Sequence, residues 1–104
     1  NGKESSNIAY VRDEDGHVIR ETMFVNGVED ARWERTYNEV GNITGSDYYE
    51  KGELMERVVM FYNDQDEVSV KIHYEKDQEA ERWENTYDKH GNLIEEIYSL
   101  VTKE

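Results

Sequence analysis

The chain has 104 residues, of which 36% are hydrophobic and 36% are charged, and its formal net charge at pH 7 is −13. This length suits one small domain, and the composition excludes a deep single core. The negative charge excludes nucleic acid and anionic membrane surfaces as expected partners, because both reward basic proteins. A basic partner or a cation is electrostatically easier to accept, and the simplest role of the charge is solubility.

Several classes of site are missing from the sequence. There is no cysteine, so disulfides and thiolate metal sites are excluded, and no apolar run approaches the length of a membrane span. No signal peptide is present, and the first residue is Asn1 rather than Met, so we expect a processed chain or a fragment of a longer one. The three histidines lack ligand spacing, and there is no Gly-rich phosphate loop or serine nucleophile. We therefore expect no enzyme, no metal and no cofactor.

After a polar leader at residues 1–6, one motif recurs every 25 residues. Tyr37–Ile43 returns as Tyr87–Leu93, with a degenerate copy at Tyr62–Val68 and a weaker one at Arg12–Val18. A fixed period of this size indicates a repeat architecture. Residues 7–104 are therefore predicted to form a single domain of four units, at about 7–31, 32–56, 57–81 and 82–104.

Each unit carries two turn signals. The first is Asp/Asn-x-x-Gly, which predicts a type I turn followed by a left-handed glycine, at Asp13–Gly16, Asn38–Gly41 and Asp88–Gly91, with Asp66 replacing the glycine in the third unit. The second is a two-residue turn, at Asn26-Gly27, Lys51-Gly52 and Lys76-Asp77. The fourth unit has Val101-Thr102 in that place, so the array is expected to stop there.

Between the turns lie proline-free segments rich in β-branched and aromatic residues, which predict strands. In chain order the predicted strands are 7–12, 17–25, 28–37, 42–50, 53–62, 67–75, 78–87 and 92–101. The predicted fold class is all-β, an up-and-down antiparallel meander of about eight strands. A sheet with one apolar face must cover it, so we expect a curled sheet or a small barrel.

The turn types predict a register. Tyr37 is expected opposite Ile43 and Trp33 opposite Asp47, while the next turn is expected to pair Tyr49 with Leu54 and Asp47 with Glu56. This register collects most bulky residues on one face, including Trp33, Tyr37, Tyr49, Leu54, Trp83 and Tyr87. The opposite face is expected to hold Arg32, Glu34, Arg57, Lys71, Arg82, Glu84, Glu96 and a column of Met23, Tyr48, His73 and Tyr98.

The main candidate binding residues follow from that column. Arg32 is expected across from Tyr48, Arg57 from His73, and Arg82 from Tyr98, as cation–π pairs that join neighbouring strands. Units two and four share far more side chains than strand pairing requires. Two causes can explain this: duplication of a two-unit module, or a partner that contacts two equivalent sites. The two candidate sites are Arg32, Trp33 and Tyr48, and Arg82, Trp83 and Tyr98, with arginine and tryptophan on opposite faces.

Three further sites are possible. Trp33 and Trp83, with Tyr37 and Tyr87, are residue types that stack sugar rings, although burial between units also explains them. Asp47 opposite Glu56 would place two carboxylates close enough for glycosidase chemistry, although a solvated sheet margin is the simpler reading. Oxygen-rich turns at Asp13–Gly16 and Asp64–Glu67 suit calcium, but Phe24 stands where a helix-loop-helix calcium site needs its bidentate glutamate.

The string Arg-Trp-Glu-x-Thr-Tyr-Asn/Asp-x-x-Gly-Asn-Ile/Leu resembles the YD repeat of large bacterial surface and secreted toxin-associated proteins. Units two and four carry it well, at Tyr37–Ile43 and Tyr87–Leu93, whereas Arg12 and Asp66 depart from it in units one and three. The resemblance implies a non-enzymatic hairpin array used for scaffolding or binding, sometimes of carbohydrate, in an extracellular or cell-envelope location. A weaker likeness is to MORN-type repeats, which have shorter periods.

These observations favour a non-catalytic β-repeat module for recognition or assembly, with protein or carbohydrate as partner and possible self-association through the sheet face. The alternative is a small acidic inhibitor or immunity-type protein that sequesters a basic enzyme, which suits the size and charge. A glycosidase built on Asp47 and Glu56 is the third hypothesis.

Overall fold

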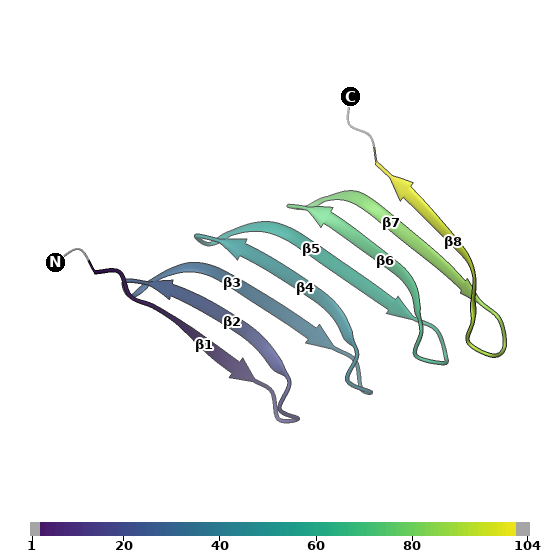
Figure 1. Cartoon of the computed structure of the whole chain (residues 1–104), viewed down its shortest axis with the longest axis horizontal. Coiled ribbons are helices and arrows are strands. Elements are labelled where there is room, and N and C mark those ends of the chain that lie inside the picture. Colours follow the sequence, from purple (N-terminus) through teal and green to yellow (C-terminus); the bar gives the residue numbers. More distant parts are fainter. Residues whose placement is uncertain (1–2, 102–104) are drawn as a thin grey trace.

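The computed structural model describes residues 3–101, which form a single antiparallel sheet in which the strands follow chain order (Figure 1). The strands are β1 (Ser6–Arg12), β2 (Val18–Val25), β3 (Val28–Tyr37), β4 (Ile43–Glu50), β5 (Glu53–Tyr62), β6 (Val68–Glu75), β7 (Gln78–Tyr87) and β8 (Leu93–Leu100). The predicted all-β meander is confirmed, and the predicted strand ends agree to within one residue. Residues 1–2 of the leader and residues 102–104 of the fourth unit, which include Thr102 of the predicted array end, lie outside the described part.

The first turn family is built by one side chain. Asn38 Oδ1 accepts hydrogen bonds from the backbone N–H groups of Val40 (3.1 Å) and Asn42 (2.9 Å). Gly41 closes the turn with φ of 92°, the left-handed value predicted from its position. The other three units repeat these bonds from Asp13, Asn63 and Asp88.

The first two of the two-residue turns also adopt the predicted backbone conformation. Asn26 and Gly27 have φ of 53° and 80°, and Lys51 and Gly52 have φ of 50° and 85°. Positive φ at both central residues defines the type I′ turn, whose twist matches that of the flanking strands. In the third unit Lys76 has φ of 59°, and Asp66 takes the place of the left-handed glycine with φ of 63°.

Each of the first three units contains two β-bulges that the predicted register lacks, and the described part of the fourth contains one. In the second unit one bulge lies between Thr36 and Tyr37, and another lies between Tyr48 and Tyr49. Tyr37 does pair with Ile43, and Tyr49 with Leu54, as predicted. Beyond each bulge every pair shifts by one residue, and a shift of one moves side chains to the opposite face.

A recurring tyrosine links each unit to the one before it. The Tyr37 hydroxyl donates to the Val18 carbonyl (2.8 Å), and the Tyr62 hydroxyl donates to the Ile43 carbonyl (2.6 Å). Tyr87 makes the same bond to Val68, at 2.7 Å. The tyrosine of the repeat therefore carries a structural hydrogen bond between units.

Replacing Tyr62 with phenylalanine should lower the free energy of unfolding by about 1 kcal/mol, because the Ile43 carbonyl loses its donor while the ring is kept. Urea denaturation measures the change. Tyr10→Phe is the matched control, since Tyr10 is 55% exposed on the edge strand β1. Equal midpoints for the two variants would show that the hydroxyl bond contributes nothing.

The sheet is open and thin. β1 and β8 lie at its two edges, so the barrel alternative is wrong (Figure 1). The principal extents are 61 × 43 × 19 Å, and within residues 3–101 only Ala31, Ile72 and Thr22 are buried. Closure would require β1 to reach β8, and the twist added by the bulges curves the sheet without bringing these edges together. Most side chains on both faces therefore keep contact with water.

Candidate functional site

The register defines two faces of the sheet. Paired residues of antiparallel strands share a face, and successive residues alternate. Trp33 pairs with Tyr48, and Trp83 pairs with Tyr98, on what we call the tryptophan face. Neighbouring Arg32 pairs with Tyr49 on the opposite side, which we call the arginine face.

The tryptophan face carries two aromatic pairs. The rings of Trp33 and Tyr48 have centroids 5.1 Å apart, and those of Trp83 and Tyr98 have centroids 5.4 Å apart. Their planes are tilted by 34° and 48°, and we call the angle between the two tilted rings of each pair a notch. The pairs are four strands apart, which corresponds to roughly 19 Å across the sheet.

A chain of polar contacts holds the second pair. Tyr98 donates its hydroxyl to Glu81 Oε2 at 2.6 Å, and the other carboxylate oxygen of Glu81 lies 2.9 Å from His73 Nδ1. His73 Nε2 lies 3.2 Å from Glu56 Oε1, so one imidazole joins β5, β6 and β7. The hydrogen bonds from Tyr98 and then His73 lower the pKa of Glu81, and the same carboxylate raises the pKa of Tyr98.

The two aromatic pairs differ in the charge beside them. Lys71 pairs with Trp83 across β6 and β7, and its Nζ lies 5.0 Å from the ring centroid. Glu21 pairs with Trp33 at the equivalent place, and its carboxylate binds Arg35 Nη1 at 2.7 Å. Tyr48 donates to Glu50 at 2.8 Å. The first notch is therefore bordered by the carboxylates of Glu21 and Glu50, and the second by the Lys71 cation and the Glu81 carboxylate.

The arginine face carries ion pairs rather than an open aromatic surface. Arg32 lies 4.1 Å from the centroid of the Tyr49 ring, and its guanidinium contacts Glu29 (2.7 Å) and Glu34 (2.8 Å). Arg82 is held by Glu79 through two hydrogen bonds of 3.0 and 3.1 Å. Both arginines of the candidate sites are therefore engaged in ion pairs with neighbouring carboxylates.

The predicted partners of the arginines are wrong. Arg32 faces Tyr49 instead of Tyr48, Arg57 faces Tyr74 instead of His73, and Arg82 faces Ser99 instead of Tyr98. The predicted column of Met23, Tyr48, His73 and Tyr98 exists, but it lies on the tryptophan face, as do Lys71 and Glu96. The bulge beside each Asn/Asp loop, between Thr36 and Tyr37 and at the equivalent places, changes the arginine partners and puts Tyr48 and Tyr98 opposite the tryptophans. A cation–π pair does form at Arg32, with the neighbouring tyrosine.

The predicted carboxylate pair is also wrong. Asp47 pairs with Arg57, whose guanidinium donates to both of its oxygens at 2.9 and 3.1 Å. Glu56 pairs with Tyr48 on the other face. The two carboxylates are separated by the sheet, so they cannot act together as acid and nucleophile. Likewise Tyr37, predicted to join Trp33, stacks on His17 at 4.5 Å.

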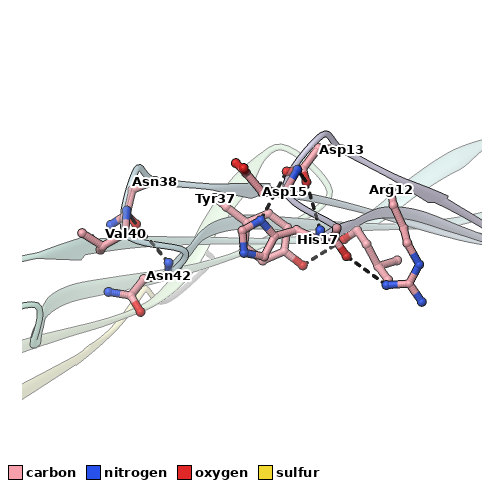
Figure 2. Close-up of polar contacts among 10 residues, drawn as sticks. Arg12, Asp13, Asp15, His17, Tyr37, Asn38, Val40 and Asn42 are labelled. Atoms are coloured by element: carbon pink, nitrogen blue, oxygen red, sulfur yellow. Dashed lines mark hydrogen bonds and ion pairs between the residues drawn. The ribbon is translucent and has the colours of Figure 1, made fainter.

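Figure 2 shows the acidic first loop beside that stack. Asp13, Asp15 and His17 each offer a potential metal ligand, with the ligand atoms within 4.8 Å of one another. Asp13 Oδ1 already accepts from the backbone N–H groups of Asp15 and His17, and its Oδ2 lies 3.3 Å from His17 Nδ1. The same bonds hold the Asn38 loop, which has no such ligand set. Turn formation therefore accounts for the arrangement.

The sequence argument missed the contacts of Lys71, His73 and Glu81 with the second aromatic pair. The signal that would have revealed them is the spacing itself, since Trp83 lies 50 residues after Trp33 and Lys71 lies 50 after Glu21. Once one bulge is included, those columns predict all of the neighbours on the tryptophan face.

The chain was compared with family models, curated proteins and solved structures. No family model matches the sequence, and no curated protein matches it. Among solved structures, the chain is similar to a DUF3836 family protein from Parabacteroides distasonis, with 18% identity, 92% of each chain covered and a TM-score of 0.42. Within residues 3–101 no helix has the length and apolar character needed to cross a membrane. The likeness to YD and MORN repeats stays a prediction.

Proposed function

We propose that this protein is a non-catalytic recognition module that binds a carbohydrate or protein ligand on its tryptophan face. The observation that carries the proposal is the pair of Trp–Tyr notches on a face that no other element covers within residues 3–101. A one-layer sheet does not need tryptophan there for a core. Among the side chains that repeat after 50 residues, Trp33 with Tyr48 and Trp83 with Tyr98 are the ones that we propose contact the ligand.

The chemistry of the notches favours a ligand with both apolar and hydroxyl surfaces. A sugar ring presents C–H groups to an aromatic ring and hydroxyl groups at its rim. Glu50 beside Tyr48, and Glu81 beside Tyr98, are carboxylates that can accept from such hydroxyls. A tyrosine-rich peptide segment offers the same combination, so a protein ligand fits the same surface.

Two notches on one rigid sheet also suit a repeating ligand. A ligand that spans roughly 19 Å reaches both, and the second contact then occurs at high effective concentration. Each contact contributes to avidity even when it is weak alone. An extended glycan or a repeat-containing protein has this form.

Removing the indole rings should abolish binding. A glycan array, followed by calorimetry with the best ligand, compares the native chain with Trp33→Ala, Trp83→Ala and the double variant. We expect each single variant to weaken binding by about tenfold or more, corresponding to about 1.4 kcal/mol, and the double variant to lose binding.

Arg32→Ala and Arg82→Ala are matched controls, because each changes the adjacent residue on the opposite face and should leave affinity unchanged. Circular dichroism and thermal melting verify that every variant is folded. Loss of binding in the arginine variants, with full binding by folded tryptophan variants, would place the ligand on the arginine face and overturn the proposal.

The net charge of −13 favours a second candidate, an acidic inhibitor of a basic enzyme. Binding of that kind is steered by long-range electrostatics, so its association rate falls steeply with ionic strength. Binding in the tryptophan notches depends chiefly on contact and changes little with salt. Affinity measured at low and high salt therefore separates the two functions.

A further inference from the structure

The last strand carries a side chain at a position that is buried elsewhere in the sheet. Thr22, Ile72 and Ile97 occupy equivalent places in their units, 25 or 50 residues apart. Thr22 and Ile72 are 7% and 6% exposed, whereas Ile97 is 49% exposed. β2 and β6 have a strand on each side, but β8 has a strand on one side only. One more strand would bury Ile97.

Neither edge strand of the sheet contains the lysine or proline that commonly protects edges against pairing. Natural edge strands carry lysine, proline or inward charges that prevent edge-to-edge association. β1 has the sequence SNIAYVR and β8 has LIEEIYSL, with neither lysine nor proline. Their exposed apolar side chains include Ile8, Tyr10, Val11, Leu93, Ile97 and Leu100.

We propose that β8 of one copy of this chain binds β1 of a second copy, head to tail, and continues the sheet. β1 is the right kind of strand, because the repeat makes it equivalent to β3, β5 and β7, and these are the strands that pair beside β2, β4 and β6. The inference concerns the sheet edges and is independent of ligand binding on the tryptophan face.

The outward-pointing backbone N–H and C=O groups of β8 and of β1 lie at positions that can pair with each other. On β8, the bond from Val101 N to Ala80 O (2.9 Å) fixes which residues point inward, and Glu96 and Tyr98 therefore direct their N–H and C=O groups outward. On β1, the bond from Asn26 N to Ser5 O (2.8 Å) leaves Ser6 and Ile8 directed outward.

The register of β2 with β3 shows how these groups meet. Glu21 pairs with Trp33, and Met23 pairs with Ala31. Glu96 and Tyr98 are the repeat equivalents of Glu21 and Met23, and Ile8 and Ser6 are those of Trp33 and Ala31. In the junction Glu96 therefore pairs with Ile8 of the next copy, and Tyr98 pairs with its Ser6. All of these residues have outward backbone groups, so the junction reproduces the hydrogen bonds of an internal strand pair.

Charge selects head-to-tail pairing over pairing of like edges. β8 carries Glu95 and Glu96 and has a charge of −2, whereas β1 carries only Arg12 and has a charge of +1. Pairing β8 with β8 would bring four carboxylates together, and pairing β1 with β1 would join two strands of like net charge. Arg12 also occupies the place of Tyr37, so in the junction its guanidinium is set to donate to the Leu93 carbonyl, as Tyr37 donates to Val18.

Two proline variants test the pairing. Ile8→Pro removes an outward donor from β1, and Glu96→Pro removes one from β8, while the inward bonds of each strand stay intact. Sedimentation velocity of the purified full chain should show native oligomers that grow with concentration. Each variant alone should be a monomer, and an equimolar mixture should form a heterodimer through the one remaining pair of native edges.

Every other result overturns the proposal. A native chain that stays monomeric at its highest soluble concentration excludes edge pairing. A dimer of Ile8→Pro alone shows pairing of β8 with β8, and a dimer of Glu96→Pro alone shows pairing of β1 with β1. Circular dichroism checks each fold. Should a proline variant unfold, Ala9→Asp and Ser99→Asp replace the pair, because they set a carboxylate opposite Glu95 and Glu4 of the adjoining copy.

Discussion

Ile72→Ala should destabilise the fold by about 2–4 kcal/mol, the range for truncating a buried isoleucine. Ile72 is 6% exposed and lies between β5 and β7, where it is one of the few side chains that water does not reach. A domain of this size has a free energy of unfolding of about 5–15 kcal/mol. This substitution therefore removes a large part of the total, and urea denaturation measures it.

Ile97→Ala is the matched control, since the residue type and the place in the repeat are the same. Ile97 is 49% exposed, so its truncation should cost less than about 1 kcal/mol when the chain is dilute. Equal losses for the two variants would show that burial between strands contributes no more than local strand propensity.

Gly41→Val and Gly91→Val should each cost at least about 1–2 kcal/mol, because a residue with a Cβ is strained in the left-handed region. Gly41 has φ of 92° and Gly91 has φ of 85°. A Cβ at Gly41 would lie 3.2 Å from His17 Nε2, and one at Gly91 would lie 3.0 Å from Glu67 Oε2. Thermal melting and urea midpoints report the loss.

Substitutions at two other positions of the same turn family separate the contribution of backbone strain from that of side-chain contact. Gly16→Val has the same strained φ, but its Cβ meets no atom within 4 Å, so it isolates the backbone contribution. Asp66→Gly is expected to stabilise the third unit, because Asp66 already occupies the left-handed conformation with φ of 63°. Unchanged melting of both valine variants would contradict the role of these glycines.

The strands and turns were predictable because their causes are local. Asn26-Gly27 is a hairpin turn wherever it stands, and Asn38 holds its loop with its own side chain. These signals lie within a few residues of the structure they dictate. The strand ends therefore followed from the sequence to within one residue.

The faces were not predictable in the same way. The bulged residue Thr44 carries no marker that its equivalents Ile19, Ser69 and Ile94 share, and its bulge decides whether Tyr48 or Tyr49 faces Arg32. Because both candidates are tyrosine, hydrophobic alternation cannot distinguish them. Barrel or open sheet was equally undetermined, since closure depends on the summed twist of eight strands and not on any single residue.

The candidate site was predicted in part. Trp33, Tyr48, Trp83 and Tyr98 were selected because they recur, and the structure brings them together as two pairs. Arg32 and Arg82 were selected for the same reason, and they lie behind those pairs on the arginine face. Recurrence identified the columns, but only the register assigns each column to a face.

The strict chain order of the strands also shapes how the protein folds. Each strand pairs only with its neighbours in the sequence, so every contact is short in chain separation and folding pays little loop-closure entropy. Such a sheet behaves as a nearly one-dimensional array, in which any hairpin can nucleate and growth proceeds outward in both directions. Folding of one strand is then coupled to folding of the next only through the contacts of that strand pair. Protection from hydrogen exchange should therefore be greatest at the centre of the sheet and decline toward β1 and β8.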